Sequence, residues 1–233
     1  MPGVKALPDG ASWSEAVGAA CKKSSVSWGS AMSACRDASD WQAALALLGG
    51  MPALKDSRGA TFYSQAMEAC AQSSHWQCAL ELFASAPETC FRSKEGGRIL
   101  YNGVLDAALE RRGSIDYFRE ALDRGVYPKL ADLRSSTIDL HQMGVAAAVM
   151  AAYWWLQVQA RAQAAGDGAS ARRLTIVTGW GRSRRRSDGR VGTLQTAVRQ
   201  LLDELGLHEK KTRNPGVVCV SRKGLETLIK AVE

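Results

Sequence analysis

A segment that repeats after 35 residues limits the fold of this chain more than any other feature. Ala31–Cys35 returns as Ala66–Cys70, and Trp41–Leu48 returns as Trp76–Phe83. Apolar residues within each copy recur three to four positions apart, the spacing of one face of an α-helix. A unit of two short helices cannot bury its apolar face alone, so we expect the copies to stack into an α-solenoid. A helical bundle without repeats is the alternative, but it gives no reason for identical residues at one spacing.

A third and weaker copy extends the array. It begins at Tyr101 and continues at Tyr117–Leu122, about three residues late, after an insert at Glu95–Arg98. Glycine and proline close the units, as at Gly125–Pro128. We therefore predict helical repeats over residues 25–134 and an N-terminal segment or partial repeat over residues 1–24. The abrupt start of the array leaves open whether the chain is N-terminally truncated.

Residues 137–233 have a different pattern, which predicts a compact two-layer α/β domain. Short β-branched or apolar runs alternate here with longer stretches of helical periodicity, which is typical of β-α-β units. The expected order is β-α-β-α-β-β with a closing helix. The elements are expected at Thr137–His141, 144–164, Arg173–Thr178, 193–205, Leu207–Arg213, Val217–Val220 and 225–232, with a turn at Asn214–Gly216. The predicted fold class is thus α + α/β, a solenoid followed by this domain.

Two short strings of this domain point to chemistry. They are Ile138-Asp139-Leu140-His141 on the first strand and Thr178-Gly179-Trp180-Gly181 at the exit of the second. Side chains at positions i and i+2 of a strand share a face, so Asp139 and His141 are expected to lie together. Ligands of parallel β-α-β units bind beyond the carboxyl ends of the strands, where His141 is a candidate acid or base with Asp139 as its partner. Taken alone, an Asp-x-His string is more often structural.

The positive charge of the chain is concentrated after residue 136. Residues 1–136 hold 15 Lys and Arg against 15 Asp and Glu, and the rest of the chain carries the whole net charge of +7. A basic block alone is most often a solvated surface. Arginines in a glycine-bearing loop favour phosphate contacts, because guanidinium groups match the geometry of phosphates and glycines let backbone N–H groups approach an anion. The candidate nucleic-acid-binding residues here are Thr178, Gly179, Trp180, Gly181, Arg182, Arg184, Arg185 and Arg186, with Trp180 placed to stack on a base.

Other patterns restrict the class of protein. The six cysteines lack the spacing of a metal site or a disulfide framework, so we expect small buried residues in a reducing compartment. The longest apolar run, Met143–Leu156, is too short to span a bilayer, and no targeting segment is visible at the N-terminus. We therefore expect no membrane partner and no structural metal.

The repeats resemble pentatricopeptide repeats over residues 25–130. The resemblance depends on the 35-residue period and on the Ala-Leu-x-Leu of each second helix. The first helix of each copy also starts with an aromatic residue, at Trp28, Tyr63 and Tyr101. In that family each repeat contacts about one RNA base through two or three side chains. The resemblance places the base-reading positions at Gly29, Ser64 and Asn102, of which Asn102 matches a typical base-reading residue.

Residues 137–220 resemble an Smr (small MutS-related) domain. That domain is marked by a Leu-Asp-x-His string on its first strand and a Thr-Gly-x-Gly string after its second, which stand here at residues 138–141 and 178–181. The Trp form, the following basic stretch and the turn Asn214–Gly216 resemble the version found behind pentatricopeptide repeats in organellar proteins. Gln142 departs from the glycine that usually follows the histidine. The resemblance implies nucleic-acid binding and, in some members, endonuclease cleavage that depends on both strings.

Together these features predict an RNA-binding protein of the organellar RNA-processing type. The repeats would position a transcript, and the Smr domain, residues 137–233, would be an RNA endonuclease with Asp139 and His141 as catalytic residues. The alternative is a non-catalytic RNA- or DNA-binding adaptor that protects transcripts or recruits partners. No small-molecule substrate or firm cofactor is implied, and a divalent metal such as Mg²⁺ stays open. The resemblance implies a plastid or mitochondrion, with the cytoplasm as the alternative.

Overall fold

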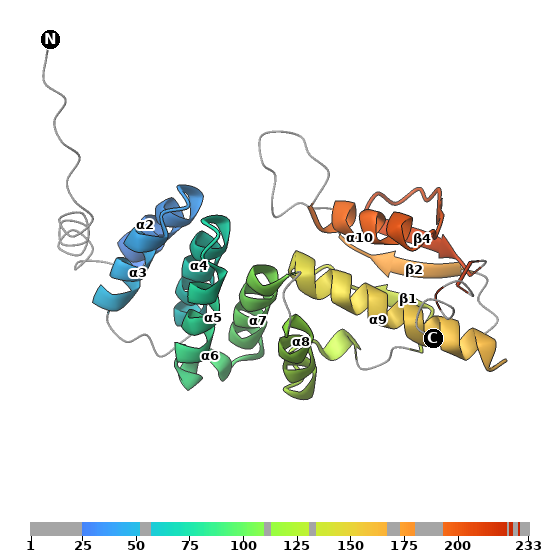
Figure 1. The fold of residues 1–233 in the computed structure, drawn as a ribbon, viewed down its shortest axis with the longest axis horizontal. Coiled ribbons are helices and arrows are strands. Elements are labelled where there is room, and N and C mark those ends of the chain that lie inside the picture. Colours follow the sequence, from blue (N-terminus) through green and yellow to red (C-terminus); the bar gives the residue numbers. More distant parts are fainter. Residues whose placement is uncertain are drawn as a thin grey trace, which may run out of the picture. The chain divides into compact units, whose positions relative to one another are not determined.

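The computed structural model describes residues 25–51, 57–109, 113–130, 134–166, 173–179, 193–222, 224–225 and 228. The chain packs as two compact units, Met1–Tyr117 and Phe118–Glu233. The described residues form nine α-helices, one short 3-10 helix and a mixed four-stranded sheet (Figure 1). The protein is therefore mostly helical, with a small sheet near its C-terminal end.

Helices of the first unit follow the predicted copies in pairs. They are α2 (Ser25–Asp37), α3 (Trp41–Gly50), α4 (Ser57–Gln72), α5 (Trp76–Ser85), α6 (Glu88–Phe91) and α7 (Lys94–Ala108), and α8 (Ser114–Asp123) begins in this unit and ends in the second. The first helices of successive copies pack on one another, α2 on α4 and α4 on α7 (Figure 1). The repeated residues form their core, since Met32, Met67, Ala44 and Ala79 are all at most 1% exposed.

The turn between the two helices of a pair also repeats. Ser39 and Ser74, 35 residues apart, have positive φ angles of 56° and 65°. The N–H of Asp40 donates to the carbonyl of Cys35 at 2.9 Å, and the N–H of His75 donates to the carbonyl of Cys70 at 2.8 Å. This is the Schellman end of a helix, which requires one residue in the left-handed conformation. The period in the sequence is therefore also a period in the backbone.

The second unit contains the sheet and two long helices. In chain order its elements are η1 (Pro128–Leu130), β1 (Thr137–Asp139), α9 (Val145–Ala164), β2 (Arg173–Val177), α10 (Thr193–Glu204), β3 (Glu209–Lys210) and β4 (Val217–Ser221). The sheet order is β1-β2-β4-β3, with β1 parallel to β2 and the other pairs antiparallel. The predicted order β-α-β-α-β-β is confirmed, and the predicted closing helix lies mostly outside the described residues.

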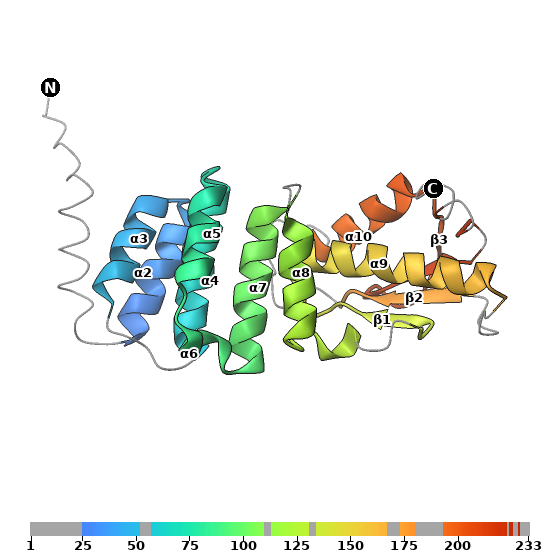
Figure 2. The same cartoon turned by 60° about the horizontal axis from the view of Figure 1, so that its bottom comes forward.

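Among the described elements, helices cover one face of this sheet (Figure 2). Ile138, Ile176 and Val218 are in register across three strands and are at most 3% exposed. Helices α9 and α10 pack on each other over that face (Figure 2). Successive side chains of a strand alternate between faces, so Asp139 and its register neighbour Val177 lie on the opposite face, where both are partly exposed. The two layers that the sequence predicts are therefore present, and Asp139 lies on the side away from the core.

The longest of the described helices, α9, has 20 residues and begins just after the first string. Trp155 Nε1 and Gln159 Nε2, both on this helix, donate to the carbonyl of Ser135 at 3.0 Å and so tie the helix to the start of β1.

In the described parts of the chain, no helix has the length and apolarity that a membrane span needs.

Candidate nucleic-acid site

The first string lies at the carboxyl end of β1, but the strand is shorter than predicted. It ends at Asp139, and His141 lies in the turn that follows. The predicted strand Thr137–His141 is therefore wrong at its end, and the two side chains are not placed together by strand alternation. Instead, Asp139 Oδ1 accepts the backbone N–H of His141 at 3.2 Å, which turns the chain out of the sheet.

This local turn brings the two side chains into contact. His141 Nδ1 lies 2.5 Å from Asp139 Oδ1. A carboxylate can only accept, so the ring proton sits on Nδ1 and leaves Nε2 as the ring nitrogen that can exchange a proton with a ligand. The His141 side chain is 39% exposed, which gives a ligand access to it.

Lys129 is a member of this cluster that the sequence did not reveal. Its Nζ lies 2.5 Å from Oδ2 of Asp139, the carboxylate oxygen that His141 does not use. Lys129 belongs to η1, ten residues upstream of Asp139 and inside the region predicted as repeats. No motif or periodicity marks it, because its role depends on how η1 packs on β1.

The pKa of the Asp139 carboxyl reflects these neighbours. Partial burial raises this pKa, but the hydrogen bonds from Lys129 and from the ring and backbone N–H groups of His141 lower it by more. The net result is a pKa below the ordinary value of an aspartate. Asp139 is therefore a carboxylate at neutral pH, as its contact with the N–H of His141 requires.

The second string meets the first at the end of β2. Gly179 has a φ of +79°, and a Cβ built there would lie 3.1 Å from Cβ of His141. A side chain at position 179 would therefore both strain the backbone and press on His141. The two strings, some forty residues apart, are thus in direct contact at the carboxyl ends of two adjacent parallel strands, as the β-α-β interpretation expects.

The turn Asn214–Gly216 supports this second string. The carbonyl of Gly216 accepts the N–H groups of Thr178 and Gly179 at 3.0 and 3.1 Å and the Thr178 hydroxyl at 3.2 Å. Asn214 Oδ1 accepts the N–H of Gly216 at 3.0 Å, and the buried Gln195 donates from Nε2 to the Pro215 carbonyl. Thr178 is 5% exposed. Thr178 and the N–H of Gly179 therefore hold the loop in place and do not face an anion.

The remaining residues of the predicted phosphate-binding loop are Trp180, Gly181, Arg182, Arg184, Arg185 and Arg186, and they lie outside the described residues. Gln142, the departure noted above, is exposed in the turn after His141. Asp139, His141 and Gly179 are thus the predicted site residues that the structure brings together.

Asn102, the candidate in the first unit, lies half-buried on α7. Its neighbour Gly103 faces α4, where an added Cβ would lie 3.1 Å from Oγ of Ser64. Gly29 likewise faces α4, with Phe62 3.8 Å from the position of an added Cβ. Two of the positions that the resemblance assigns to base reading, Gly29 and Ser64, therefore lie where successive first helices meet.

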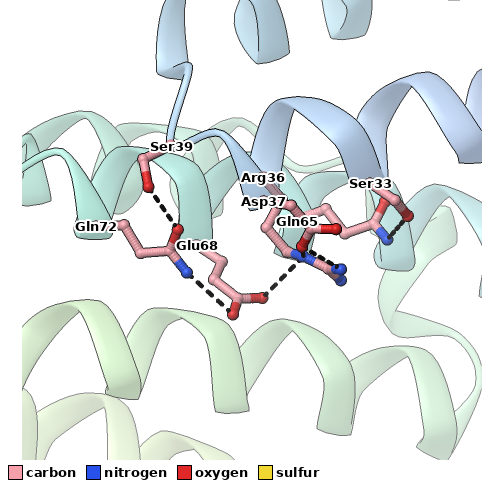
Figure 3. Close-up of polar contacts among 7 residues, drawn as sticks. All are labelled: Ser33, Arg36, Asp37, Ser39, Gln65, Glu68 and Gln72. Carbon is pink, nitrogen blue, oxygen red and sulfur yellow. Dashed lines mark hydrogen bonds and ion pairs between the residues drawn. The ribbon is translucent and has the colours of Figure 1, made fainter. Parts of the chain in front are cut away.

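A row of polar side chains runs along α2 and α4 (Figure 3). It consists of Ser33, Arg36, Asp37 and Ser39 from α2 and its following turn, and of Gln65, Glu68 and Gln72 from α4. Gln65 Nε2 donates to Ser33 Oγ at 3.1 Å, and Arg36 lies 2.8 Å from Asp37 and 4.0 Å from Glu68. One cation beside two carboxylates does not make a phosphate-binding surface, so this row is suited to neutral polar contacts.

Metal binding finds no support in the described parts of the chain, where no three His, Cys, Asp or Glu side chains gather into a possible metal site. Both oxygens of Asp139 already face Lys129 and His141. These residues therefore do not fit a Mg²⁺ ion.

Comparison with models of known protein families and with curated proteins finds no match to this sequence.

Proposed function

We propose that this protein binds RNA through its helical repeats and cleaves it at the edge of the sheet. In this proposal the first unit is a solenoid of pentatricopeptide type that positions a transcript, and the α/β region is an Smr domain that acts as an endonuclease. The period in the backbone, with one left-handed residue in each turn, supports the first part. The α/β order and the two strings support the second. An organellar location, in a plastid or mitochondrion, belongs to the same proposal.

The observation that carries the proposal is the contact between Gly179 and His141. Two strings distant in the sequence meet where ligands of parallel β-α-β units bind, with the imidazole partly exposed and Asp139 behind it. A structural Asp-His pair would not need a glycine with positive φ against the histidine. The N-terminus of α9, four residues after His141, adds a partial positive charge that favours an anion.

The arrangement suits general acid–base catalysis on a phosphodiester. His141 Nε2 would accept the proton of the attacking oxygen, either a water or the 2′-hydroxyl of RNA, as that oxygen bonds to phosphorus. It would then return a proton to the leaving oxygen as the P–O bond to that oxygen breaks, while Asp139 keeps the ring oriented through Nδ1. The guanidinium groups after Gly181 would hold the phosphate and offset the charge that develops on it. Each step uses a group of this chain and requires no cofactor.

The test is cleavage of end-labelled single-stranded and stem-loop RNAs by the full chain and by His141→Ala. Loss of the acid–base group should reduce the rate by about 10²- to 10⁴-fold. His208→Ala is the matched control, because that histidine is exposed after α10 and is expected to keep the wild-type rate. Equal cleavage by the wild type and His141→Ala, at equal thermal stability, would contradict the assignment. RNAs with single 2′-deoxy substitutions then decide which oxygen attacks.

A second candidate is a non-catalytic adaptor, favoured by the bonds of Gly216. The Gly216 carbonyl accepts the backbone N–H groups of Thr178 and Gly179 and the hydroxyl of Thr178. These donors of the second string therefore cannot stabilise a transition state. The adaptor would bind by counterion release, and its affinity would fall steeply with salt. Salt-dependent binding without cleavage of any RNA or DNA in the panel would favour this candidate.

A further inference from the structure

Lys129 is held in place by buried residues on both sides. Tyr127 and Leu130 are 6% and 4% exposed, and the N–H of Leu130 donates to the carbonyl of Tyr127 at 3.0 Å. The 3-10 helix η1 that contains Lys129 packs directly on β1. These contacts leave the backbone of Lys129 little freedom, so the fold itself presents the ammonium group to the end of β1.

Asp139 offers one oxygen to each of its two charged or titratable partners. Oδ2 lies 2.5 Å from Lys129 Nζ, and Oδ1 lies 2.5 Å from His141 Nδ1 and 3.2 Å from its backbone nitrogen. A carboxylate with one partner can rotate about its last bond and exchange its oxygens. A second partner on Oδ2 removes that freedom, so Oδ1 stays with His141.

No other charged group competes for this carboxylate within the described residues. The elements packed on β1 are η1 and β2, and the register neighbour of Asp139 on β2 is the apolar Val177. Lys129 and His141 are the charged or titratable groups that influence Asp139. Among the described residues, Lys129, Asp139 and His141 therefore form one connected group.

We propose that Lys129 is a positioning residue of this site, which holds Oδ2 of Asp139 so that Oδ1 orients the His141 ring and leaves Nε2 free to transfer a proton. Its role in cleavage rests on the proposed function. Lys129 acts through Asp139 and is not required to touch RNA. The lowered pKa of the Asp139 carboxyl agrees with this role, because an adjacent ammonium favours the charged form.

The test uses the full chain and the substitutions Lys129→Met and Lys129→Arg. One readout is the titration of the Asp139 carboxyl, followed by NMR of ¹³C-labelled aspartate. Lys129→Met should move its midpoint to higher pH and broaden the Nδ1–H signal of His141, and Lys129→Arg should restore both. The other readout is RNA cleavage at neutral pH, which should fall about two- to fivefold in Lys129→Met, the range expected for a partly exposed ion pair. Lys94→Met, which removes an exposed lysine from the first unit, should change neither quantity.

The two readouts separate this proposal from the proposed function. If the wild type cleaves RNA but Lys129→Met leaves either the midpoint or the rate unchanged, the positioning role is overturned and the endonuclease stands. If the wild type cleaves nothing, the proposed function fails, and the role of Lys129 in cleavage fails with it even where the midpoint moves. A normal rate and midpoint in Lys129→Arg, after their change in Lys129→Met, support the proposal.

Discussion

The two units of this protein differ in how they use charge. Met1–Tyr117 holds 11 Lys and Arg against 12 Asp and Glu, whereas Phe118–Glu233 holds 19 against 11. In the polar row of the first unit, the one cation, Arg36, lies beside carboxylates of its own unit. In the second unit, Lys129 and His141 both contact a single carboxylate, that of Asp139, on the face of the sheet opposite to α9 and α10 (Figure 2).

This difference indicates a division of roles. Neutral side chains such as Ser and Gln recognise hydrogen-bonding edges with little cost in desolvation, whereas guanidinium and ammonium groups attract phosphates wherever they occur. Under the proposed function, the nearly neutral first unit would select a segment of RNA and the basic second unit would bind its backbone. The proposed function predicts that mutations in the two units have different effects.

After the loss expected for His141→Ala, the largest effect follows from Gly179→Ala. Its Cβ would meet Cβ of His141 at 3.1 Å in a backbone with φ of +79°. We expect a loss of about 1–3 kcal/mol in the free energy of unfolding from backbone strain. Displacement of the imidazole should reduce cleavage on the order of 10²-fold.

Gly166→Ala is the control for this substitution. Gly166 has a similar φ of +73°, but an added Cβ would have no atom within 4 Å. It should show the loss of stability, measured by urea denaturation, without the loss of cleavage. Equal cleavage by the two variants would mean that the contact with His141 has no part in the chemistry.

The next effect concerns binding. Replacing Arg184, Arg185 and Arg186 together by alanine should weaken RNA binding on the order of tenfold and reduce the slope of log affinity against log salt by about 2. Arg36→Ala should leave that slope unchanged, because Arg36 lies beside Asp37 and Glu68. Fluorescence anisotropy at several salt concentrations measures both. A lower slope in Arg36→Ala would mean that Arg36 also contacts phosphates, and would contradict the difference in charge use between the two units.

The smallest effect is a pH dependence of stability in the second unit. The pKa of Asp139 is lower in the folded protein than in the unfolded chain, where it is near 4. The ionised carboxylate therefore stabilises the fold above about pH 4. This contribution to the free energy of unfolding is lost as the pH falls through the folded pKa. Lys129→Met should therefore lower the free energy of unfolding at pH 7 by at most about 1 kcal/mol, because both partners are partly exposed. The difference from wild type should vanish at acid pH, below the folded pKa of Asp139. A difference that persists there would show that Lys129 acts by packing.

Periodicity predicted most of the elements, because the apolar spacing that marks helices and strands is also what buries them. The end of β1 was predicted two residues too far, since the side chain of Asp139 bonds to the backbone of His141 and competes with the strand. The insert Glu95–Arg98 forms the first turn of α7, where a Cβ at Gly96 would clash with the Cys90 carbonyl. A glycine that allows close packing and one that forms a loop look alike in a sequence.

The candidate site was only partly predictable for a related reason. Asp139, His141 and Gly179 belong to strings with recognisable spacing, so their meeting was expected from the topology of parallel strands. Lys129 has no such spacing, and its contact depends on the packing of one short turn. The role of Gly216 was equally hidden, because a carbonyl that accepts three hydrogen bonds leaves no trace in the identity of its residue.

The repeated left-handed turn has a consequence for engineering. Ser39 and Ser74, with φ angles of 56° and 65°, stand two residues before the second helix of two successive pairs. Glycine takes this conformation without the steric cost that a side chain adds. Anyone who lengthens this protein by another helical pair should therefore treat helix, turn and helix as one module and place glycine at that position. A β-branched residue there would be the first fault to look for in a lengthened protein that fails to fold.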